Sequence, residues 1–185
     1  MRMKPALFLD RDGVINREVN YLHKIEDFEF IDGVFESCQF FQKQGYELIV
    51  VTTQAGIGRG YYTEADFQTL TDWMSQQFAS RNVHIAQTYF SPYHPTHGVG
   101  HYGCDHPDRK PNPGMLLRAQ QDWKIDLAKS IMVGDKESDI SAGLNAGVNT
   151  TVLVRSGHAV DEATTKASAV INSIADLPTL FQSWR

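Results

Sequence analysis

The chain has 185 residues, of which 42% are hydrophobic and 21% are charged, and its formal net charge is −5. This composition is typical of one folded globular domain and excludes a disordered chain. The acidic balance argues against a nucleic-acid-binding protein, which would carry a basic excess. No apolar run approaches the ~20 residues that a membrane span needs. No signal-peptide pattern precedes the first apolar segment, so we expect a cytoplasmic protein.

Short apolar runs alternate along the chain with segments of helical periodicity. The runs predict strands at residues 6–9, 47–52, 87–90, 131–133 and 151–154. The helical segments are residues 33–44, 64–80, 113–123 and 137–146, and a short strand and a packing helix are expected in 170–185. Because the runs are uniformly apolar, they favour a parallel sheet that is buried on both faces. The alternation predicts an α/β fold in which residues 1–185 form one domain, with a doubly wound (Rossmann-like) parallel sheet.

Residues 91–112 interrupt this alternation of strands and helices and form a long loop rich in proline, histidine and glycine. A loop of that length inside a compact domain is typically functional. Ligands of doubly wound folds bind beyond the carboxyl ends of the strands. Residues capable of chemistry are therefore expected to follow the predicted strands.

Two carboxylates, Asp10 and Asp12, directly follow the first predicted strand. Carboxylates at this spacing repel one another unless they share a cation, and Mg²⁺ is the natural occupant. One carboxylate can attack phosphorus to give an aspartyl-phosphate, and the other can protonate the leaving oxygen and later activate water. The plainer alternative for the pair alone is a solvated loop or a helix cap.

Three further residues lie near the ends of other predicted elements. Thr52 ends the second strand, where its hydroxyl could hold phosphate oxygens, although a turn-forming threonine is the simpler interpretation. Lys110 precedes a helix, where it would neutralise a transferring phosphoryl group or remain a solvated cation. Asp135 follows the fourth strand and suits a metal ligand, while Asp139, one turn later, could cap the helix or orient a neighbour.

In this order and at these strand ends, the features resemble the four motifs of the haloacid dehalogenase (HAD) superfamily. The resemblance implies that Asp10 is the nucleophile and Asp12 the general acid and base. Thr52 and Lys110 are implied to stabilise the phosphoryl group. Mg²⁺ is implied to bind Asp10, the backbone carbonyl of Asp12 and Asp135. An aspartate at position 12 also implies rapid hydrolysis of the aspartyl-phosphate.

Five stretches resemble, more narrowly, the D,D-heptose 1,7-bisphosphate 7-phosphatase family, namely residues 8–16, 28–34, 56–60, 109–115 and 132–139. The family removes the C7 phosphate during synthesis of nucleotide-activated heptose for lipopolysaccharide. With no large cap insertion, selectivity would come from short loops. The resemblance implies substrate contacts from Arg11, Glu18, Val19, Asn20, Tyr21, Thr53, Gln54, Arg109 and Lys136. Arg109 would suit the distal phosphate through a bidentate contact, or would be an exposed loop arginine.

The same family carries a structural zinc site in the loop before Arg109, and here the chain departs from the pattern. Aligned without gaps, the ligand positions hold Ser91, Tyr93, His106 and Asp108, which cannot form a thiolate-rich cage. A loop held by turns and hydrogen bonds is therefore preferred over a zinc site. The alternative is a rearranged zinc site built from His94, His97, His101, Cys104 and His106.

Two other functions stay open at this point. A histidinol-phosphate phosphatase would share the four motifs, and a non-catalytic binding protein could use the same scaffold. The binding protein is disfavoured because it has no need of an acid and base such as Asp12. The expected partner is a small phosphorylated sugar, with no nucleic acid or membrane, and the expected state is a monomer. His84 and His158 lack a ligand partner at useful spacing and are expected to be surface or packing residues.

Overall fold

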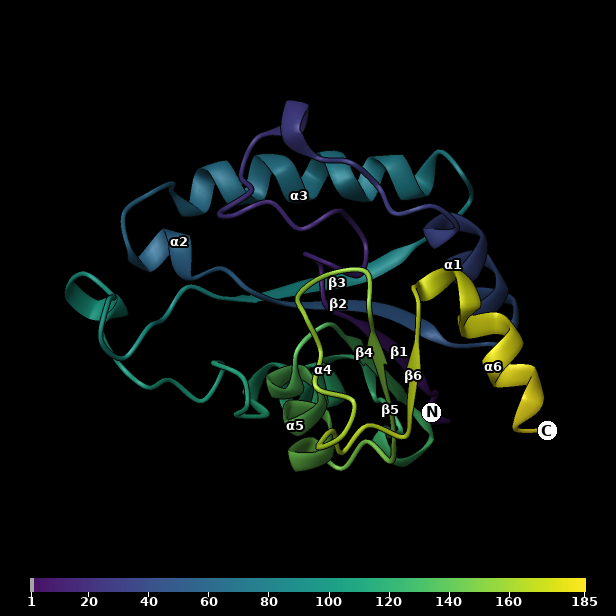
Figure 1. Ribbon diagram of the computed structural model, residues 1–185. Helices are drawn as coiled ribbons and strands as arrows, with labels where there is room; N and C mark the ends of the chain where they lie inside the picture. Colours follow the sequence, from purple (N-terminus) through teal and green to yellow (C-terminus); the bar gives the residue numbers. More distant parts are fainter. Residues whose placement is uncertain (1) are drawn as a thin grey trace.

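The computed structural model describes residues 2–185, in which the apolar runs form one six-stranded sheet with every neighbouring pair parallel (Figure 1). The strands are β1 (Ala6–Leu9), β2 (Glu47–Thr53), β3 (Ile85–Ser91), β4 (Ile131–Gly134), β5 (Thr150–Val154) and β6 (Ala169–Ile171). Every residue of β1 and of β4 is buried. Burial on both faces explains why these segments show no polar alternation, and the predicted fold class is confirmed.

The four helices with predicted ranges form there, with ends that shift by at most one residue, and a helix also forms in the predicted 170–185 segment. The short helix at residues 55–58 is not predicted. The helices are α1 (Val34–Lys43), α2 (Ala55–Gly58), α3 (Glu64–Ala79), α4 (Gly114–Trp123), α5 (Glu137–Ala146) and α6 (Leu177–Ser183). The start of α3 is fixed by a capping box, in which Thr63 Oγ1 accepts from the Asp66 N–H and Asp66 Oδ2 accepts from the Thr63 N–H. Gly147 ends α5 with a left-handed φ of 101°, a conformation that glycine adopts without steric cost.

The helices cover both faces of the sheet, with α1, α3 and α6 on one side and α4 and α5 on the other (Figure 1). Successive strand residues point to opposite faces. In β1, Leu7 and Leu9 join the core under α1 and α3, whereas Ala6 and Phe8 join the core under α4 and α5. Each face therefore has its own apolar core.

The strand order β3-β2-β1-β4-β5-β6 places β1 between β2 and β4. The chain runs outward from β1 to β3 in one direction, then returns to β4 and continues outward in the other. The order reverses at β1, which is the topological switch point where doubly wound folds bind ligands. No helix within residues 2–185 combines the length and the apolarity needed to cross a membrane.

Candidate active site

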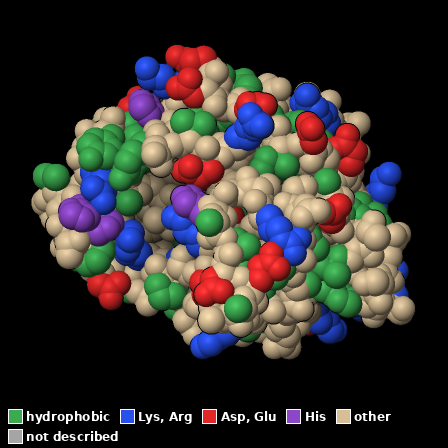
Figure 2. Space-filling model, viewed as in Figure 1, with side chains coloured by type: hydrophobic (Ala, Val, Ile, Leu, Met, Phe, Trp, Pro, Cys, Tyr) green, Lys and Arg blue, Asp and Glu red, His purple; other side chains and the backbone are tan. Residues whose placement is uncertain are grey.

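A cavity of about 320 Å³ lies at the carboxyl ends of β1, β2 and β4, as the switch point predicts. The space-filling view shows a hollow surrounded by acidic, cationic and histidine side chains (Figure 2). Asp10 and Asp12 line the cavity immediately after β1, and Asp135 lines it immediately after β4. Residues that lie far apart in the sequence are thus brought to one edge of the sheet.

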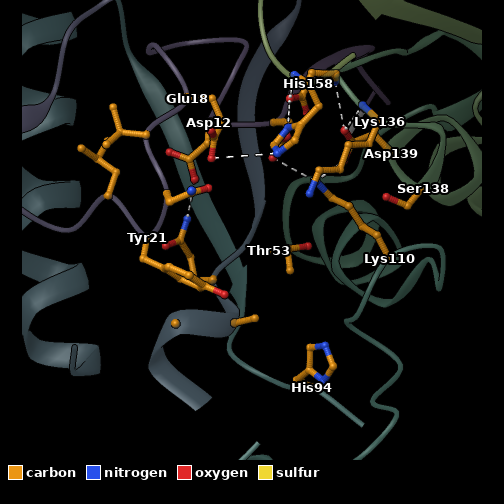
Figure 3. Close-up of a pocket in the computed structure, with 18 of the residues that line it drawn as sticks. Asp12, Glu18, Tyr21, Thr53, His94, Lys110, Lys136, Ser138, Asp139 and His158 are labelled. Atoms are coloured by element: carbon orange, nitrogen blue, oxygen red, sulfur yellow. Dashed lines mark hydrogen bonds and ion pairs between the residues drawn. The ribbon is translucent and has the colours of Figure 1, made fainter. Parts of the chain in front are cut away.

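Three buried carboxylates, those of Asp10, Asp135 and Asp139, have oxygen atoms that all lie within 4.8 Å of one another. The ammonium of Lys110 reaches this cluster from the loop before α4 (Figure 3). Its Nζ lies 3.1 Å from Asp10 Oδ1, 2.7 Å from Asp139 Oδ1 and 2.8 Å from the backbone oxygen of Val51. One buried cation therefore faces three buried carboxylates, and the cluster has an excess of negative charge.

Burial and the neighbouring carboxylate of Asp139 raise the pKa of Asp10 well above its usual range, and Lys110 opposes this shift only in part. Burial would lower the pKa of Lys110, but Asp10 and Asp139 outweigh it and raise the pKa above its ordinary value. Lys110 is therefore held in its charged form. For Asp135, burial acts to raise the pKa, but the hydrogen bonds from His158 leave the net shift downward.

The donor set fits a divalent cation. Asp135 Oδ1 is buried and has no hydrogen-bond partner among the described residues, whereas Oδ2 of the same carboxylate is fully engaged. An unpartnered buried oxygen is costly unless a further group satisfies it, and oxygen-only sites suit Mg²⁺. Asp139 belongs to the same cluster, but both its oxygens are occupied: Oδ2 accepts from the N–H groups of Asp135 and Lys136, and Oδ1 pairs with Lys110. Asp139 thus both caps α5 and orients its neighbours.

The carboxylate of Asp12 is held from three directions. Arg11 contacts it at 3.0 to 3.2 Å, Asn16 Nδ2 donates at 3.0 Å, and Gln54 Nε2 donates at 3.2 Å. Arg11 is only 1% exposed, and its Nη2 also donates to the backbone oxygen of Leu22. Arg11 does not line the cavity. The structure thus places it behind Asp12, away from the substrate contact that the family resemblance implies.

The residues that follow β2 form a second wall. Thr53 and Gln54 line the cavity, whereas Thr52 is fully buried beside it and is not among the lining residues. The hydroxyl oxygen of Thr52 accepts a hydrogen bond of 2.9 Å from Gln54 Nε2. The Tyr62 hydroxyl donates to Gln54 Oε1. Thr52 and Tyr62 therefore fix the amide of Gln54, which in turn contacts Asp12.

The rim combines predicted and unpredicted residues. The predicted residues that line the cavity are Glu18, Val19, Asn20, Tyr21, Arg109 and Lys136. The lining residues outside the predicted set are Leu22, Ala55, Gly56, Arg59, Tyr62 and Ser138, together with His94, which the sequence favours only as a ligand of an alternative zinc site, and His158, which is expected to be a surface or packing residue. Arg59 lies in the glycine-rich stretch 56–60, which is one of the stretches that carry the family resemblance. That stretch is the one sequence signal that could have identified Arg59.

The expectation that His158 is a surface or packing residue is wrong. Its ring lines the cavity, where Nδ1 lies 2.7 Å from Asp135 Oδ2 and the backbone N–H donates to the same oxygen at 2.9 Å. Its other ring nitrogen, Nε2, lies 4.0 Å from Glu18 Oε1. The error arises because the contact depends on the loop after β5, whose course no sequence periodicity predicts. His84, by contrast, is exposed, as expected.

Comparison with curated proteins identifies relatives over nearly the whole chain. The chain is 54% identical over 172 residues to D-glycero-alpha-D-manno-heptose-1,7-bisphosphate 7-phosphatase of Burkholderia mallei, covering 93% of this chain and 90% of the relative. It is 50% identical over 177 residues to D-glycero-beta-D-manno-heptose-1,7-bisphosphate 7-phosphatase of Escherichia coli (strain K12), covering 94% and 92%. The chain belongs to the heptose-1,7-bisphosphate 7-phosphatase family. A HAD-hydrolase-like family model also matches residues 108–177.

Solved structures support the fold of this family. A Mesorhizobium loti protein assigned as a HAD-like phosphatase has a TM-score of 0.85 and 33% identity, covering 98% of this chain and 87% of its own. D,D-heptose 1,7-bisphosphate phosphatase from B. bronchiseptica, complexed with magnesium and phosphate, has a TM-score of 0.78 and 24% identity, covering 98% and 99%. At that identity the second likeness shows the fold alone.

Proposed function

We propose that the chain is a Mg²⁺-dependent phosphatase that removes the C7 phosphate of D-glycero-D-manno-heptose 1,7-bisphosphate. The product would feed the synthesis of nucleotide-activated heptose for lipopolysaccharide. The observation that carries the proposal is the placement of Asp10 against Lys110 and Asp135, with Asp12 oriented at the wall of the same cavity. The names of the relatives at 54% and 50% identity support the choice of substrate.

In the first step, the carboxylate of Asp10 attacks the phosphorus of the C7 phosphate, and the bond from phosphorus to the sugar oxygen breaks. The leaving oxygen takes a proton from the carboxyl group of Asp12, so that the sugar departs as an alcohol. The phosphoryl group is then bonded to Asp10. The contacts from Arg11, Asn16 and Gln54 support this role of Asp12, because they fix the direction in which its carboxyl group points.

In the second step, water attacks the phosphorus and the bond to the Asp10 oxygen breaks, which releases inorganic phosphate. Asp12, now a carboxylate, accepts the proton of that water, so both side chains return to their starting state. Lys110 stabilises charge on the transferring group throughout. Thr52 contributes through the amide of Gln54, the contact that the structure gives it.

Mg²⁺ would be held by Asp10, the backbone carbonyl of Asp12 and Asp135. When bound, it neutralises charge on the phosphoryl oxygens. The unpartnered Asp135 Oδ1 and the excess of carboxylates over cations in the cluster both support this assignment. Asp139 is excluded from the proposed ligands because Lys110 and two backbone N–H groups occupy its oxygens.

The lining of the cavity also suits a second phosphate. Arg59, Arg109 and Lys136 all line the cavity and supply positive charge in addition to that of Lys110. Arginine binds phosphate through paired N–H donors. A bisphosphate would therefore place one phosphate at Asp10 and the other at these cations. The residues Glu18, Val19, Asn20 and Tyr21 would contact the sugar between them.

We propose that the 91–112 loop is held without zinc. Tyr93 stacks on His106 with ring centroids 3.8 Å apart and planes 6° apart. His106 Nδ1 accepts from the Asp108 N–H, and Arg118 pairs with Asp108 at 2.8 Å. Three of the four positions where the family pattern has zinc ligands thus make direct contacts with one another. Within residues 2–185, the histidines and cysteines of this loop bring no three ligand atoms together.

The test is a panel of phosphorylated metabolites assayed with Mg²⁺ and with excess chelator. The panel contains both anomers of the heptose bisphosphate, because relatives are named for each, together with histidinol phosphate. We expect kcat/KM with Mg²⁺ to be highest for a heptose bisphosphate, and we expect no turnover in excess chelator. A higher kcat/KM for histidinol phosphate would identify histidinol phosphate as the substrate instead. No turnover of any compound would favour the non-catalytic binding protein.

The remaining expectations belong to the same proposal. We expect the whole chain to act as one domain and as a monomer, with no nucleic-acid partner. We place the reaction in the cytoplasm, where phosphorylated sugars, which do not cross membranes, are made and consumed.

A further inference from the structure

The loop after β5 packs directly on Asp135, although no sequence motif marks it. Ser156 Oγ donates a hydrogen bond of 2.7 Å to the backbone oxygen of Gly13, the residue after Asp12. Gly157 passes so close to Asp135 that a Cβ at this position would lie 2.2 Å from Oδ2. Such an approach is possible only for glycine. The loop is thus fixed both to the segment that carries Asp10 and Asp12 and to Asp135.

Within this loop, His158 makes two hydrogen bonds to one oxygen. Its backbone N–H and its ring Nδ1 lie 2.9 Å and 2.7 Å from Asp135 Oδ2. A carboxylate oxygen can only accept, so Nδ1 carries a proton in this contact. Both bonds converge on Oδ2, and Oδ1 of the same carboxylate is left buried, with no hydrogen-bond partner in the described part of the chain. The contacts of His158 therefore decide which oxygen of Asp135 is available.

We propose that His158 is a positioning residue for the divalent cation, acting through Asp135. By occupying Oδ2 it presents Oδ1 to the metal and holds the carboxylate in one orientation. The inference rests on the metal site of the proposed function. Groups that hydrogen-bond to a metal ligand commonly change metal affinity about 10- to 100-fold when they are removed. Since the backbone N–H to Oδ2 survives any side-chain substitution, we expect the lower end of that range.

A matched pair of substitutions isolates the ring proton. Asparagine carries a donor, Nδ2, at the same number of bonds from Cα as the histidine Nδ1. Leucine has nearly the same shape as asparagine and no donor. The His158 side chain is 40% exposed, so neither His158→Asn nor His158→Leu opens a cavity in the core. His84→Leu, on the exposed residue outside the cavity, is the control.

The experiment is calorimetric titration of Mg²⁺ into metal-free protein, with circular dichroism to verify that each variant is folded. The readout requires no substrate. We expect His158→Leu to raise the Kd for Mg²⁺ about 10-fold, His158→Asn to stay near wild type, and His84→Leu to be unchanged. An unchanged Kd in His158→Leu would overturn the proposal, as would an equal rise in both His158 variants, which would mean that the ring proton is not the cause. If the wild-type protein bound no Mg²⁺, the metal site itself would be wrong.

Discussion

Arg11 directs the carboxylate of its neighbour Asp12 through Nε and Nη2, at 3.0 to 3.2 Å. The arginine is buried and carries a positive charge, yet it does not itself line the cavity. Burying a guanidinium is costly unless it is paired. The placement indicates that the charge serves Asp12, the proposed general acid and base.

The first prediction follows from this pair. Arg11→Lys keeps the charge but loses the planar fork that fixes both oxygens of Asp12. We expect kcat to fall about 10- to 100-fold, because a misaligned Asp12 carboxyl group would lose part of the rate enhancement that general acid–base catalysis provides. KM should change little, since Arg11 does not line the cavity. Steady-state kinetics measure both, with Arg17→Lys at an exposed position as the control. A large rise in KM with kcat intact would instead favour a direct substrate contact.

Asp10→Asn tests the nucleophile. An amide cannot form the acyl phosphate, so we expect kcat to fall about 1,000-fold or more. Asp72→Asn, on the exposed face of α3, should retain wild-type turnover. A second measurement is to stop the reaction during turnover of a substrate with a labelled phosphate and to locate the label on the protein. The label should appear on Asp10 in the wild type and should be absent from the variant. A variant that still turned over near the wild-type rate would exclude Asp10.

Arg109→Ala tests the second phosphate site. We expect kcat/KM for the heptose bisphosphate to fall about 10- to 100-fold, the cost of losing a hydrogen bond to a charged group. An aryl monophosphate has no second phosphate and should be hydrolysed nearly as before. Arg118→Ala is the control, because Arg118 pairs with Asp108 without lining the cavity. Equal losses on both substrates would point to a distorted loop, since Arg109 Nη1 also donates to the Tyr93 oxygen.

From the contacts within the 91–112 loop, we expect the protein to contain no structural zinc. Protein purified without a histidine tag should contain far less than one zinc per chain by elemental analysis. Its melting temperature should not fall in a zinc-selective chelator, because the Tyr93–His106 stack and the Asp108–Arg118 pair need no metal. Tyr93→Ala should lower it. One tightly held zinc per chain would contradict this account.

The two cysteines should differ in reactivity. Cys38 is fully buried, and burial raises its pKa to about 12. Its thiol therefore stays protonated and unreactive at pH 9, since only the thiolate attacks alkylating reagents. Cys104 is exposed. Iodoacetamide at pH 9 should add one group to the folded protein, at Cys104, and two in denaturant, as counted by mass spectrometry. Modification of Cys38 at the same rate would show that α1 opens readily.

The sequence was sufficient to predict the placement of residues that directly follow strands. Asp10, Asp12 and Asp135 each follow a buried strand, so the parallel order of the sheet was sufficient to bring them together. Residues on irregular loops were harder to find. His94 and His158 carry no periodic signal, because their positions depend on tertiary contacts such as the Ser156 anchor.

Arg11 illustrates a different limit. Motif resemblance indicates that a residue matters but not which way its side chain points. Arg11 lies in a bend beyond the end of β1, where the alternation of a strand no longer sets the direction of a side chain. Its guanidinium turns to the carboxylate of Asp12 and does not line the cavity, and no sequence pattern signals that direction.

The ammonium of Lys110 has three protons, and Asp10, Asp139 and the Val51 carbonyl accept all three. Held in this way, the lysine is a stationary charge and has no proton to exchange with the substrate. The amount by which Lys110 lowers the activation barrier of the reaction should therefore stay constant over the pH range in which the protein is active. The pH profile of turnover should therefore report the carboxyl groups around it, and a shift in that profile would identify a change in their surroundings.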